Sequence, residues 1–570
     1  MLLRNVIVSG TYTERMKLIM KKKQQHMPVV IVCILIILVA VIGLATHFIL
    51  KYTPTREKAD LNEYYGTVQE GEAALIVGTQ RIETRAQIAE GMQYLPLEAV
   101  NTYLNQRYYW DEEGKQILYA TPSELTATPA SDTPGGEVWT KDGSVYLSVP
   151  FVQKYTDMDV YTAEEPARIA IQCDFTDVNT VTVNKDTYVR IRGGIKAEVL
   201  TRVEKGTVLT LMEELEDWDQ VATSDGYTGY IEKKKVSEPQ VQTMEREFEK
   251  EEYTYYNMEE PVNMAWHQVT NMDANAGLAE TVQNVSGVNV ISPTWFTIAD
   301  NDGNVSGIPS ADYVAQAHER GMQVWPLIDN FKEEVTTTEV LSHTSSRQNL
   351  IRQLVDGTLS VGADGINVDF ESLKEDVGPH FLEFLRELSI ECHKNELVLS
   401  VDNPVPEDFT SHYDRTEQGR VVDYVIIMGY DEHYVGSEQA GSVASLPWVE
   451  KGIVDTLKEV DPSRVINAIP FYTRLWKTSG GALTSEAIGM DQAQEVISVH
   501  QVETYWDQEA GQNYGTYESE GDTYQIWLED AQSVAAKVKL IPKYELAGVA
   551  QWKLGFENSG IWSVISENLQ

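Results

Sequence analysis

The spacing of apolar residues along the chain predicts the secondary structure of its carboxyl-terminal region. From about residue 262 to the carboxyl terminus, short apolar runs alternate with stretches whose apolar residues recur every three or four positions. Short apolar runs indicate buried strands, and the longer period indicates amphipathic helices. Strands that alternate with helices are typical of a parallel α/β fold.

Eight strand candidates and five helical stretches occur in this region. The strands are expected to begin near Val262, Val288, Met322, Gly365, Leu397, Val422, Arg464 and Ala547. The helices are expected at Ala311–Glu319, Ser346–Leu359, Phe381–His393, Leu446–Val460 and Asp530–Ile541. Eight strands in a region of this length predict a (β/α)8 TIM barrel over residues 261–570. The long polar stretch at about 477–525 predicts an insertion between the seventh and eighth strands.

The residues before the barrel predict two smaller domains. Residues 181–236 contain alternating strand-like runs separated by glycine turns, which predicts a small all-β domain. Residues 62–175 predict a small α+β spacer domain. Within it, Tyr94-Leu-Pro-Leu-Glu-Ala-Val is echoed by Tyr146-Leu-Ser-Val-Pro-Phe-Val, and each phrase runs from an apolar pair into a helix-like stretch.

Two polar stretches are expected to lack regular structure. Thr121–Gly136 is rich in threonine, proline, serine and glycine, which predicts a loop. Residues 237–260 are charged and have little apolar periodicity, which predicts a linker to the barrel.

The amino terminus carries a nearly unbroken apolar run from Val29 to Leu50. A helix of this length can cross a bilayer core of roughly 30 Å. More basic residues precede the run, within residues 1–28, than follow it. The positive flank should stay in the cytoplasm, so the rest of the chain is expected outside the cell as a single-pass membrane protein. The alternative is a cleavable signal peptide, for which Gly43-Leu-Ala45 offers a weak site.

Charge and cysteine content exclude two classes of interaction. The formal net charge is -42, from 87 acidic and 45 basic residues, so nucleic acid is not an expected partner. The acidity can also serve solubility alone. The three cysteines, Cys33, Cys173 and Cys392, are far apart and show no zinc spacing. The cysteines therefore predict no zinc site.

The fourth predicted strand carries the most specific chemistry of the sequence. It reads Asp364-Gly-Ile-Asn367-Val-Asp369-Phe-Glu371. Side chains alternate along a strand, so Asn367, Asp369 and Glu371 share one face while the intervening apolar residues take the other. Two carboxylates at one strand end repel each other, which raises a pKa and lets Glu371 keep a proton near neutral pH.

This motif resembles the signature of glycoside hydrolase family 18, Asp-x-x-Asp-x-Asp-x-Glu, and the resemblance extends over about Val262 to the carboxyl terminus. The upstream domains also resemble known modules. Residues 181–236 resemble a bacterial SH3 domain through Val-Arg-Ile-Arg-Gly-Gly and Trp-Asp-Gln-Val with Gly-Tyr-Thr-Gly-Tyr-Ile, which implies wall binding or positioning of the barrel. Residues 62–175 resemble the amino-terminal domain of copper amine oxidases through the repeated phrases, which implies a spacer or adhesion role without copper ligands.

The family resemblance implies substrate-assisted, retaining hydrolysis that needs no metal or organic cofactor. Glu371 would protonate the glycosidic oxygen while the substrate's N-acetyl carbonyl attacks the anomeric carbon. Asp369 would hold the acetamido N–H, and Tyr430 would hydrogen-bond the same group. Trp552 would form the apolar floor beneath the sugar. The remaining candidate substrate-binding residues lie at other strand ends: Met428, Asp431, Tyr472 and Arg474.

Asn367 departs from the family signature, which has aspartate at this position. Asparagine can hydrogen-bond Asp369 but cannot ionise, and the change resembles the branch of spore-cortex and spore-germination N-acetylglucosaminidases. The expected function is cleavage of β-1,4 bonds in N-acetylglucosamine-containing glycans, with peptidoglycan favoured over chitin by the export segment and the SH3-like domain. A chitinase, a lectin-like binding protein without catalysis and a structural role in wall assembly remain the alternatives.

Overall fold

The apolar runs predicted as strands in the carboxyl-terminal region all form strands in the computed structural model, which describes residues 6–244 and 246–569. Each begins within two residues of its predicted start. The strands are β18 (Val262–His267), β19 (Val290–Pro293) with β20 (Phe296–Ile298), β22 (Gln323–Val324) with β23 (Leu327–Asp329), β24 (Gly365–Asp369), β25 (Val398–Pro404), β26 (Tyr424–Met428), β27 (Val465–Pro470) and β33 (Gly548–Trp552).

These strands form one curled, parallel, TIM-like sheet, which we call the barrel sheet. From β23 to β27 each strand pairs with the next in parallel. β33 pairs with both β27 and β18, and β18 continues to β19. The second and third positions are each split into two pieces, since β19 pairs with β22 and β20 with β23. Because all pairs are parallel, the carboxyl ends of the strands meet at one rim, the mouth.

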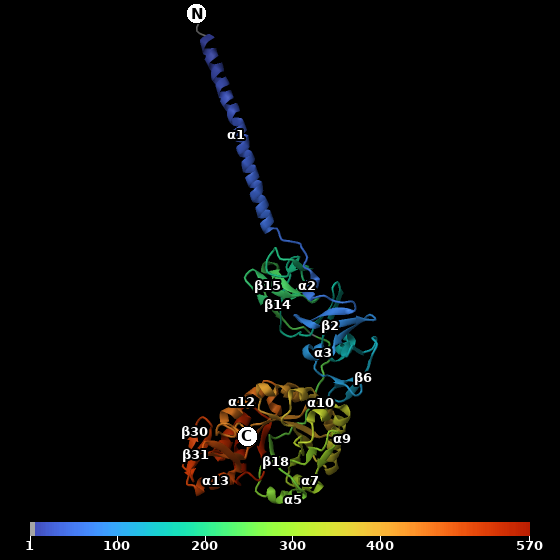
Figure 1. Ribbon diagram of the computed structural model, residues 1–570, viewed down its shortest axis with the longest axis vertical. Coiled ribbons are helices and arrows are strands. Elements are labelled where there is room, and N and C mark those ends of the chain that lie inside the picture. The colour runs from blue at the N-terminus through green and yellow to red at the C-terminus, as the bar shows by residue number, and fades with distance from the viewer. Residues whose placement is uncertain (1–5, 245, 570) are drawn as a thin grey trace. The chain divides into compact units, whose positions relative to one another are not determined.

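Helices cover the outer face of the barrel sheet (Figure 1). The five predicted helices correspond to α7 (Ala311–His318), α9 (Thr344–Val361), α10 (Gly378–Lys394), α12 (Leu446–Thr456) and α14 (Ala531–Val538). Shorter helices are α5 (Met272–Ala276), α6 (Leu278–Thr281), α8 (Thr337–Ser342), α11 (Arg415–Val421), α15 (Leu540–Lys543) and α16 (Ile561–Asn568). One apolar cluster packs between sheet and helices, and a second fills the inside of the sheet.

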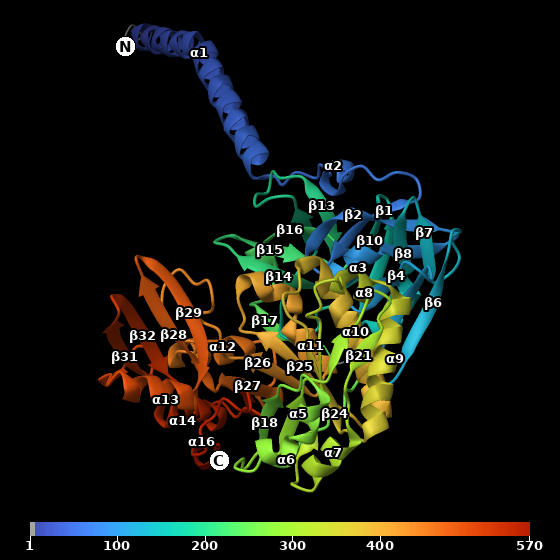
Figure 2. The same cartoon turned by 60° about the horizontal axis from the view of Figure 1, so that its bottom comes forward.

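The predicted insertion follows β27 and forms a small antiparallel sheet beside the barrel sheet (Figure 2). It consists of β28 (Tyr472–Ser479), β29 (Ala482–Gly489), α13 (Met490–Val499), β30 (Thr504–Asp507), β31 (Gln512–Ser519) and β32 (Asp522–Leu528). Ala493 of α13 packs on Ile488, Ile526 and Leu528. This apolar contact joins the helix to one face of the sheet.

Residues 105–145 belong to the compact unit that contains the barrel sheet, together with residues 249–570. We call this segment the barrel arm. It contains β4 (Tyr108–Asp111), β5 (Gln116–Ala120), β6 (Leu125–Ser131) and β7 (Val138–Lys141). The prediction of a loop at Thr121–Gly136 is therefore wrong. β6 forms because β5 and β7 supply backbone partners on both sides, which outweighs the turn-rich local composition.

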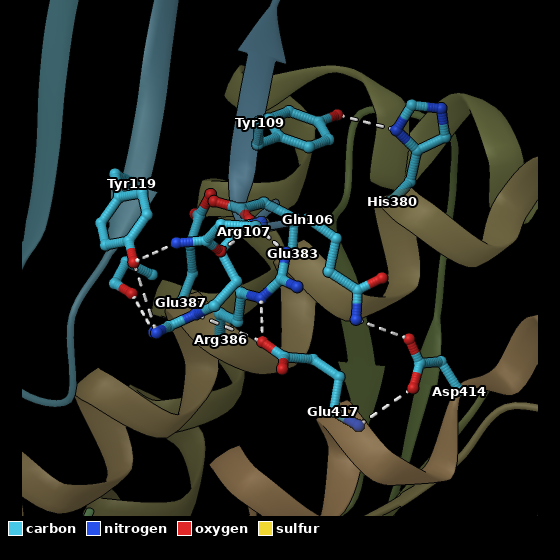
Figure 3. Close-up of polar contacts among 12 residues, drawn as sticks. Gln106, Arg107, Tyr109, Tyr119, His380, Glu383, Arg386, Glu387, Asp414 and Glu417 are labelled. Atoms are coloured by element: carbon cyan, nitrogen blue, oxygen red, sulfur yellow. Dashed lines mark hydrogen bonds and ion pairs between the residues drawn. The ribbon is translucent and has the colours of Figure 1, made fainter. Parts of the chain in front are cut away.

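A buried network of charges attaches the barrel arm to α10 and α11 (Figure 3). Arg107 of the arm lies 3.3 Å from the carboxylate of Glu417, which also accepts a 2.9 Å hydrogen bond from Nε of Arg386. The three side chains are nearly inaccessible to solvent. Burial alone would raise the pKa of Glu417, but the guanidinium groups of Arg386, Arg107 and Arg420 outweigh it and hold that pKa below its usual value. Glu417 is therefore ionised, and the arm is joined to the barrel by a fully charged contact.

The other compact unit, Met1–Leu104 with Tyr146–Phe248, contains the predicted all-β domain and the two ends of the predicted spacer, whose middle, residues 105–145, belongs to the barrel unit. Its α+β part has α2 (Leu61–Tyr65), β1 (Glu72–Val77), β2 (Gln80–Ala89), β3 (Met92–Pro96), α3 (Leu97–Tyr103), β8 (Ser144–Ser148), α4 (Val149–Tyr155), β9 (Asp159–Glu164) and β10 (Ala167–Gln172). The two echoed phrases form strand–helix pairs, as predicted. Their strands also pair with each other, with Leu95 opposite Leu147.

The all-β part has seven strands. They are β11 (Val178–Thr182), β12 (Thr187–Arg190), β13 (Val199–Val203), β14 (Val208–Glu214), β15 (Trp218–Ala222), β16 (Thr228–Glu232) and β17 (Gln240–Gln242). Alternate side chains such as Val189, Val221 and Ile231 form its core. β17 lies within the stretch predicted as a linker and pairs with β11.

The amino-terminal apolar run lies in helix α1 (Val6–Tyr52). Its apolar portion, Val29–Tyr52, has 24 residues and none of its residues is buried. At about 1.5 Å per residue it is long enough to cross a bilayer. A membrane span and a signal sequence both fit this helix. The first five residues of the predicted basic tail lie outside the described residues.

Candidate active site

The predicted catalytic motif, residues 364–371, contains β24 and the residues that flank it. Ile366, Val368 and Phe370 point outward into the cluster beneath the helices. Phe370 stacks on Phe384 of α10, with ring centroids 5.4 Å apart. The intervening positions therefore point into the barrel, and the motif ends with Glu371 exposed at the mouth.

Asn367 lies completely buried below the mouth, with every polar group engaged. Its Oδ1 accepts from Trp266 Nε1 at 2.9 Å and from Ser292 Oγ at 3.3 Å. Its Nδ2 donates to Ser400 Oγ at 3.0 Å and to Asp402 Oδ1 at 2.8 Å. The expectation that it hydrogen-bonds Asp369 is corrected, because Asp402 takes that place. Any effect of Asn367 on substrate binding would therefore be indirect.

Asp402 is a site residue that the sequence reasoning missed. It lies on β25 and is 1% exposed. Asn367 is in register with Ser400 and Val368 with Val401, so the next pair along is Asp369 with Asp402. Ser400 and Asp402 alternate along β25 as Asn367 and Asp369 do along β24, and this alternation was a signal in the sequence. It was overlooked because no motif marks the fifth strand.

Asp369 is buried beside Asp402, and no cation of the described part of the chain pairs with it. Its Oδ1 has no hydrogen-bond partner among the described residues. Burial raises the pKa of Asp369 well above its usual value, and the carboxylates of Asp402, Glu371 and Asp329 raise it further. The site therefore favours a protonated form of at least one of these inner carboxyl groups.

Glu371 reaches solvent at the mouth but is surrounded by protein on its other sides. Partial removal from solvent raises its pKa, and the carboxylates of Asp431 and Asp329 add to the increase. Asp329, on β23, accepts a 2.5 Å hydrogen bond from Thr297 Oγ1. A glutamic acid that keeps its proton in this way can act as a general acid.

Asn330 holds the backbone of Glu371 from the neighbouring strand end. Its Oδ1 accepts from Glu371 N at 2.9 Å, and its Nδ2 donates to Glu371 O at 3.0 Å. Nδ2 also donates to Thr337 Oγ1 at 3.1 Å. These two hydrogen bonds fix the position of the Glu371 backbone at the mouth. No motif in the sequence marks Asp329 or Asn330, which lie at the end of β23.

The strand ends after β26 and β27 bring three further candidates together. The rings of Tyr430 and Tyr472 lie 6.3 Å apart, and Tyr472 Oη donates to Asp431 Oδ1 at 2.6 Å. Burial raises the pKa of Tyr430 well above its usual value, with further increases from Asp369 and Asp402, so its hydroxyl stays protonated. Met428 is half-buried at the end of β26, next to this group.

Trp552 and Arg474 lie at the edges of this cluster. Trp552 ends β33, is half-buried and contacts Trp266 edge-on, with ring centroids 5.8 Å apart. Trp266 in turn donates to Asn367, so Trp552 and the inner amide are connected through Trp266. Arg474 is half-buried on β28 and donates to Ser485 Oγ at 3.2 Å. Burial, together with Asp431, raises the pKa of Tyr472 well above its usual value, and the nearby Arg474 offsets part of this increase.

Asp364, the first residue of the motif, has a different place. Its Oδ2 lies 2.8 Å from His318 Nε2 and accepts from Val324 N at 2.7 Å. These contacts are at the start of β24, away from the mouth. Asp364 therefore fastens the neighbouring strand and helix rather than joining the carboxylate cluster.

A glutamic acid with a raised pKa beside a buried aspartate, at the mouth of a TIM-like sheet, is the arrangement expected of a glycoside hydrolase. The family model "Glycosyl hydrolases family 18" matches residues 249–557, which is more than half of the 570 residues. The chain belongs to glycosyl hydrolase family 18. A bacterial SH3 domain matches residues 184–238, upstream of the catalytic part.

Similarity to individual proteins supports this family assignment. The chain is 24% identical over 291 residues to the uncharacterized glycosylase YvbX of Bacillus subtilis, covering 49% of this chain and 84% of that protein. It is 24% identical over 283 residues to the cortical fragment-lytic enzyme of Bacillus subtilis, covering 47% of this chain and 65% of that enzyme. The solved spore cortex-lytic enzyme SleL of Bacillus cereus has the same fold, with 19% identity, a TM-score of 0.50 and coverage of 58% and 79% of the two chains.

Proposed function

We propose that this protein hydrolyses β-1,4 bonds that follow N-acetylglucosamine in peptidoglycan. The observation that carries the proposal is the raised pKa of Glu371, which supplies a general acid at the mouth of the barrel sheet. The bacterial SH3 domain and the similarity to a cortical fragment-lytic enzyme support a wall glycan as substrate. We also infer that the curled sheet is a complete (β/α)8 barrel, because β33 pairs with both β27 and β18.

The proposed mechanism assigns one task to each side chain. Glu371 protonates the glycosidic oxygen as the bond breaks, while the acetamido carbonyl of the sugar attacks the anomeric carbon. Asp369 accepts the acetamido N–H and stabilises the positive charge that develops on this group. The protonated hydroxyl of Tyr430 donates a hydrogen bond to the same group. Glu371 then takes a proton from the water that opens the cyclic intermediate, so configuration is retained.

The remaining candidate residues bind the substrate. Trp552 packs against the apolar face of the sugar ring at the cleavage point. Asp431 and Tyr472 act as one hydrogen-bonded pair beside Tyr430. Met428 contributes apolar surface, and Arg474 binds the glycan from the insertion.

We test this function with purified peptidoglycan and with chitin oligomers, and we measure released reducing ends. The wild-type protein is expected to cleave peptidoglycan, and Glu371→Gln is expected to be slower by about 10²- to 10⁴-fold because a general acid is lost. Glu450→Gln, which changes an acid that contacts Lys543, is the matched control with unchanged rate. Equal rates for wild type and Glu371→Gln would refute the assignment.

The products distinguish the alternatives. Mass analysis should find N-acetylglucosamine at the new reducing end if the proposal holds. Cleavage of chitin oligomers alone would indicate a chitinase. Binding of either glycan without any release, by wild type and variant alike, would indicate a lectin-like protein.

A further inference from the structure

Asp402 is a buried carboxyl group to which neither the family motif nor the proposed mechanism gives a task. It is 1% exposed, and it faces the inside of the barrel rather than the helices. Its contact in the structure is the 2.8 Å hydrogen bond that Oδ1 accepts from Asn367 Nδ2. A buried carboxylate without a cation is costly, so a lone structural aspartate is a poor choice at this position.

The neighbouring Asp369 has a buried oxygen that lacks a hydrogen bond within the described residues. The register of β24 and β25 places the two residues side by side, yet Asp369 Oδ1 is buried without a partner among the described residues. Asp402 has a donor that stabilises its anion, whereas Asp369 has none. One proton placed on Asp369 and directed at Asp402 would remove both problems, because it removes one charge and supplies the missing hydrogen bond.

We propose that Asp369 and Asp402 share one proton, and that Asp402 takes this proton from Asp369 when the acetamido group of the substrate binds. The transfer breaks an O–H bond on Asp369 and forms one on Asp402, and the proton returns when the product leaves. Asp369 thereby becomes the anion that accepts the acetamido N–H. This inference rests on the proposed function of Asp369, and it makes Asp402 a positioning residue that acts through Asp369.

Asn367 has a clear part in this arrangement. An aspartate at 367 would add a third ionisable group to the inner cluster, whereas asparagine is neutral and satisfies four partners. The ionisable group lost from β24 is thus present on β25. The titratable groups that face the pair are Glu371 after β24, Asp329 on β23 and Tyr430 after β26.

The first experiment follows the pH dependence of kcat/KM for Asp402→Asn. The working form needs one proton on the pair, and two neighbouring carboxyls that share a proton take up the second one only at low pH. The amide introduced by this substitution cannot accept the proton, so Asp369 must release it to water from a buried site. The acid limb of the profile should therefore move to higher pH, with kcat at acidic pH lower by about 10-fold or more.

The opposite shift would overturn the proposal. If Asp402 were a permanently charged neighbour, its removal would take away a like charge and move the acid limb to lower pH. The double variant Asn367→Asp/Asp402→Asn exchanges the two side chains. Positions 367 and 402 then still carry one carboxyl and one amide in contact with each other. The double variant should return the acid limb toward that of the wild type, and a failure to do so counts against proton sharing.

A second measurement does not depend on any substrate. Infrared titration in the Glu371→Gln background should show a protonated carboxyl band that persists to high pH, because a second charge on the pair is costly. In Asp402→Asn this band should vanish at lower pH. An unchanged titration would overturn the proposal. A wild type that cleaves no glycan, but shows this titration, would refute the proposed function and leave the shared proton supported.

The matched control is Asp423→Asn, which lies directly before β26, at the end of the barrel sheet opposite the mouth. Asp423 is completely buried and accepts from Leu399 N and Tyr256 N, both at 2.8 Å. Its loss should lower the melting temperature without moving the acid limb or the infrared titration. A shift of either in this variant would show that any buried aspartate produces the effect, and would contradict the proposal.

Discussion

Burial and like charges together raise the pKa of Glu371 above its usual value. Removal from solvent is the largest cause of its raised pKa, and Asp431 and Asp329 are the other two. The acid is active only while protonated, so the rate should fall as pH rises through this raised pKa. The alkaline limb of the pH profile therefore reports on the neighbours of Glu371.

Asp431→Asn should move this alkaline limb to lower pH. The variant removes one negative charge near Glu371 but keeps an oxygen that can accept from Tyr472. Asp431 is not among the groups that raise the pKa of Asp369, so the acid limb should stay in place. The measurement is kcat against pH, with Asp455→Asn, whose native aspartate pairs with Lys451, as control. An upward shift would contradict the electrostatic account.

Asn330 offers a second test at the residue scale, because it positions Glu371 without touching its carboxyl group. Asn330→Ala removes both backbone contacts of Glu371. Loss of one or two positioned hydrogen bonds should lower kcat about 10-fold with a smaller change in KM. Thr337→Ala, which removes only the outer partner of Asn330, should have a much smaller effect. Equal losses in both variants would show a general disturbance of the mouth.

At the scale of elements, the barrel arm shows how charge can join two segments that are distant in the sequence. Glu417 of α11 is bound by Arg107 of the arm, by buried Arg386 of α10 and by Arg420, whose side chain is 48% exposed. Arg347 and Glu387 form a second buried pair beside this contact, 2.8 Å apart. The buried charges of the Glu417 cluster keep all their ion-pair partners only while the barrel arm stays packed against α10 and α11.

Arg107→Ala should therefore destabilise the barrel unit strongly. The variant leaves Glu417 buried with one guanidinium fewer, which costs about 3–5 kcal/mol for a broken buried pair. Arg420→Ala removes an exposed partner of the same carboxylate and should cost less than about 1 kcal/mol. Denaturant unfolding of both variants measures the difference, and glycan cleavage at low temperature should be unchanged in each. Similar stabilities for the two variants would refute the role of the buried network.

At the scale of the whole molecule, the chain combines an apolar helix, a bacterial SH3 domain and a family 18 catalytic part. The helix fits a signal peptide or an anchor, which places the protein at the cell surface or outside the cell. We propose a retained anchor with the amino terminus in the cytoplasm, because basic residues are concentrated before the helix. The resemblance of residues 62–175 to a copper amine oxidase domain stays a prediction.

The anchor can be tested by mass spectrometry of the mature protein expressed in a bacterium. A retained anchor predicts peptides from residues 53 onward together with those from the amino-terminal flank, and recovery in the membrane fraction. Extraction should require detergent rather than high salt, because apolar contact rather than charge holds a spanning helix. A mature amino terminus near Ala45 and a soluble product would show that the segment is a signal peptide.

Much of this protein follows from local sequence. Alternation on β24 placed Asp369 and Glu371 inward, and the period of apolar residues located the strands of the barrel sheet to within two residues. These predictions succeed because side-chain direction in a strand and the face of a helix depend on near neighbours in the chain. The motif itself is a local feature, so the class of enzyme could be predicted from the sequence alone.

Only the tertiary structure decided which residues meet. β6 forms in a turn-rich stretch because the adjacent strands β5 and β7 pair with it. Residues 105–145 join the barrel unit although they interrupt the spacer predicted over 62–175. Asp402 lies 33 positions after Asp369 in the chain and was found only through the pairing of β24 with β25. Burial and the approach of like charges depend on three-dimensional packing, and they are what turn ordinary aspartates and glutamates into a candidate proton-handling site.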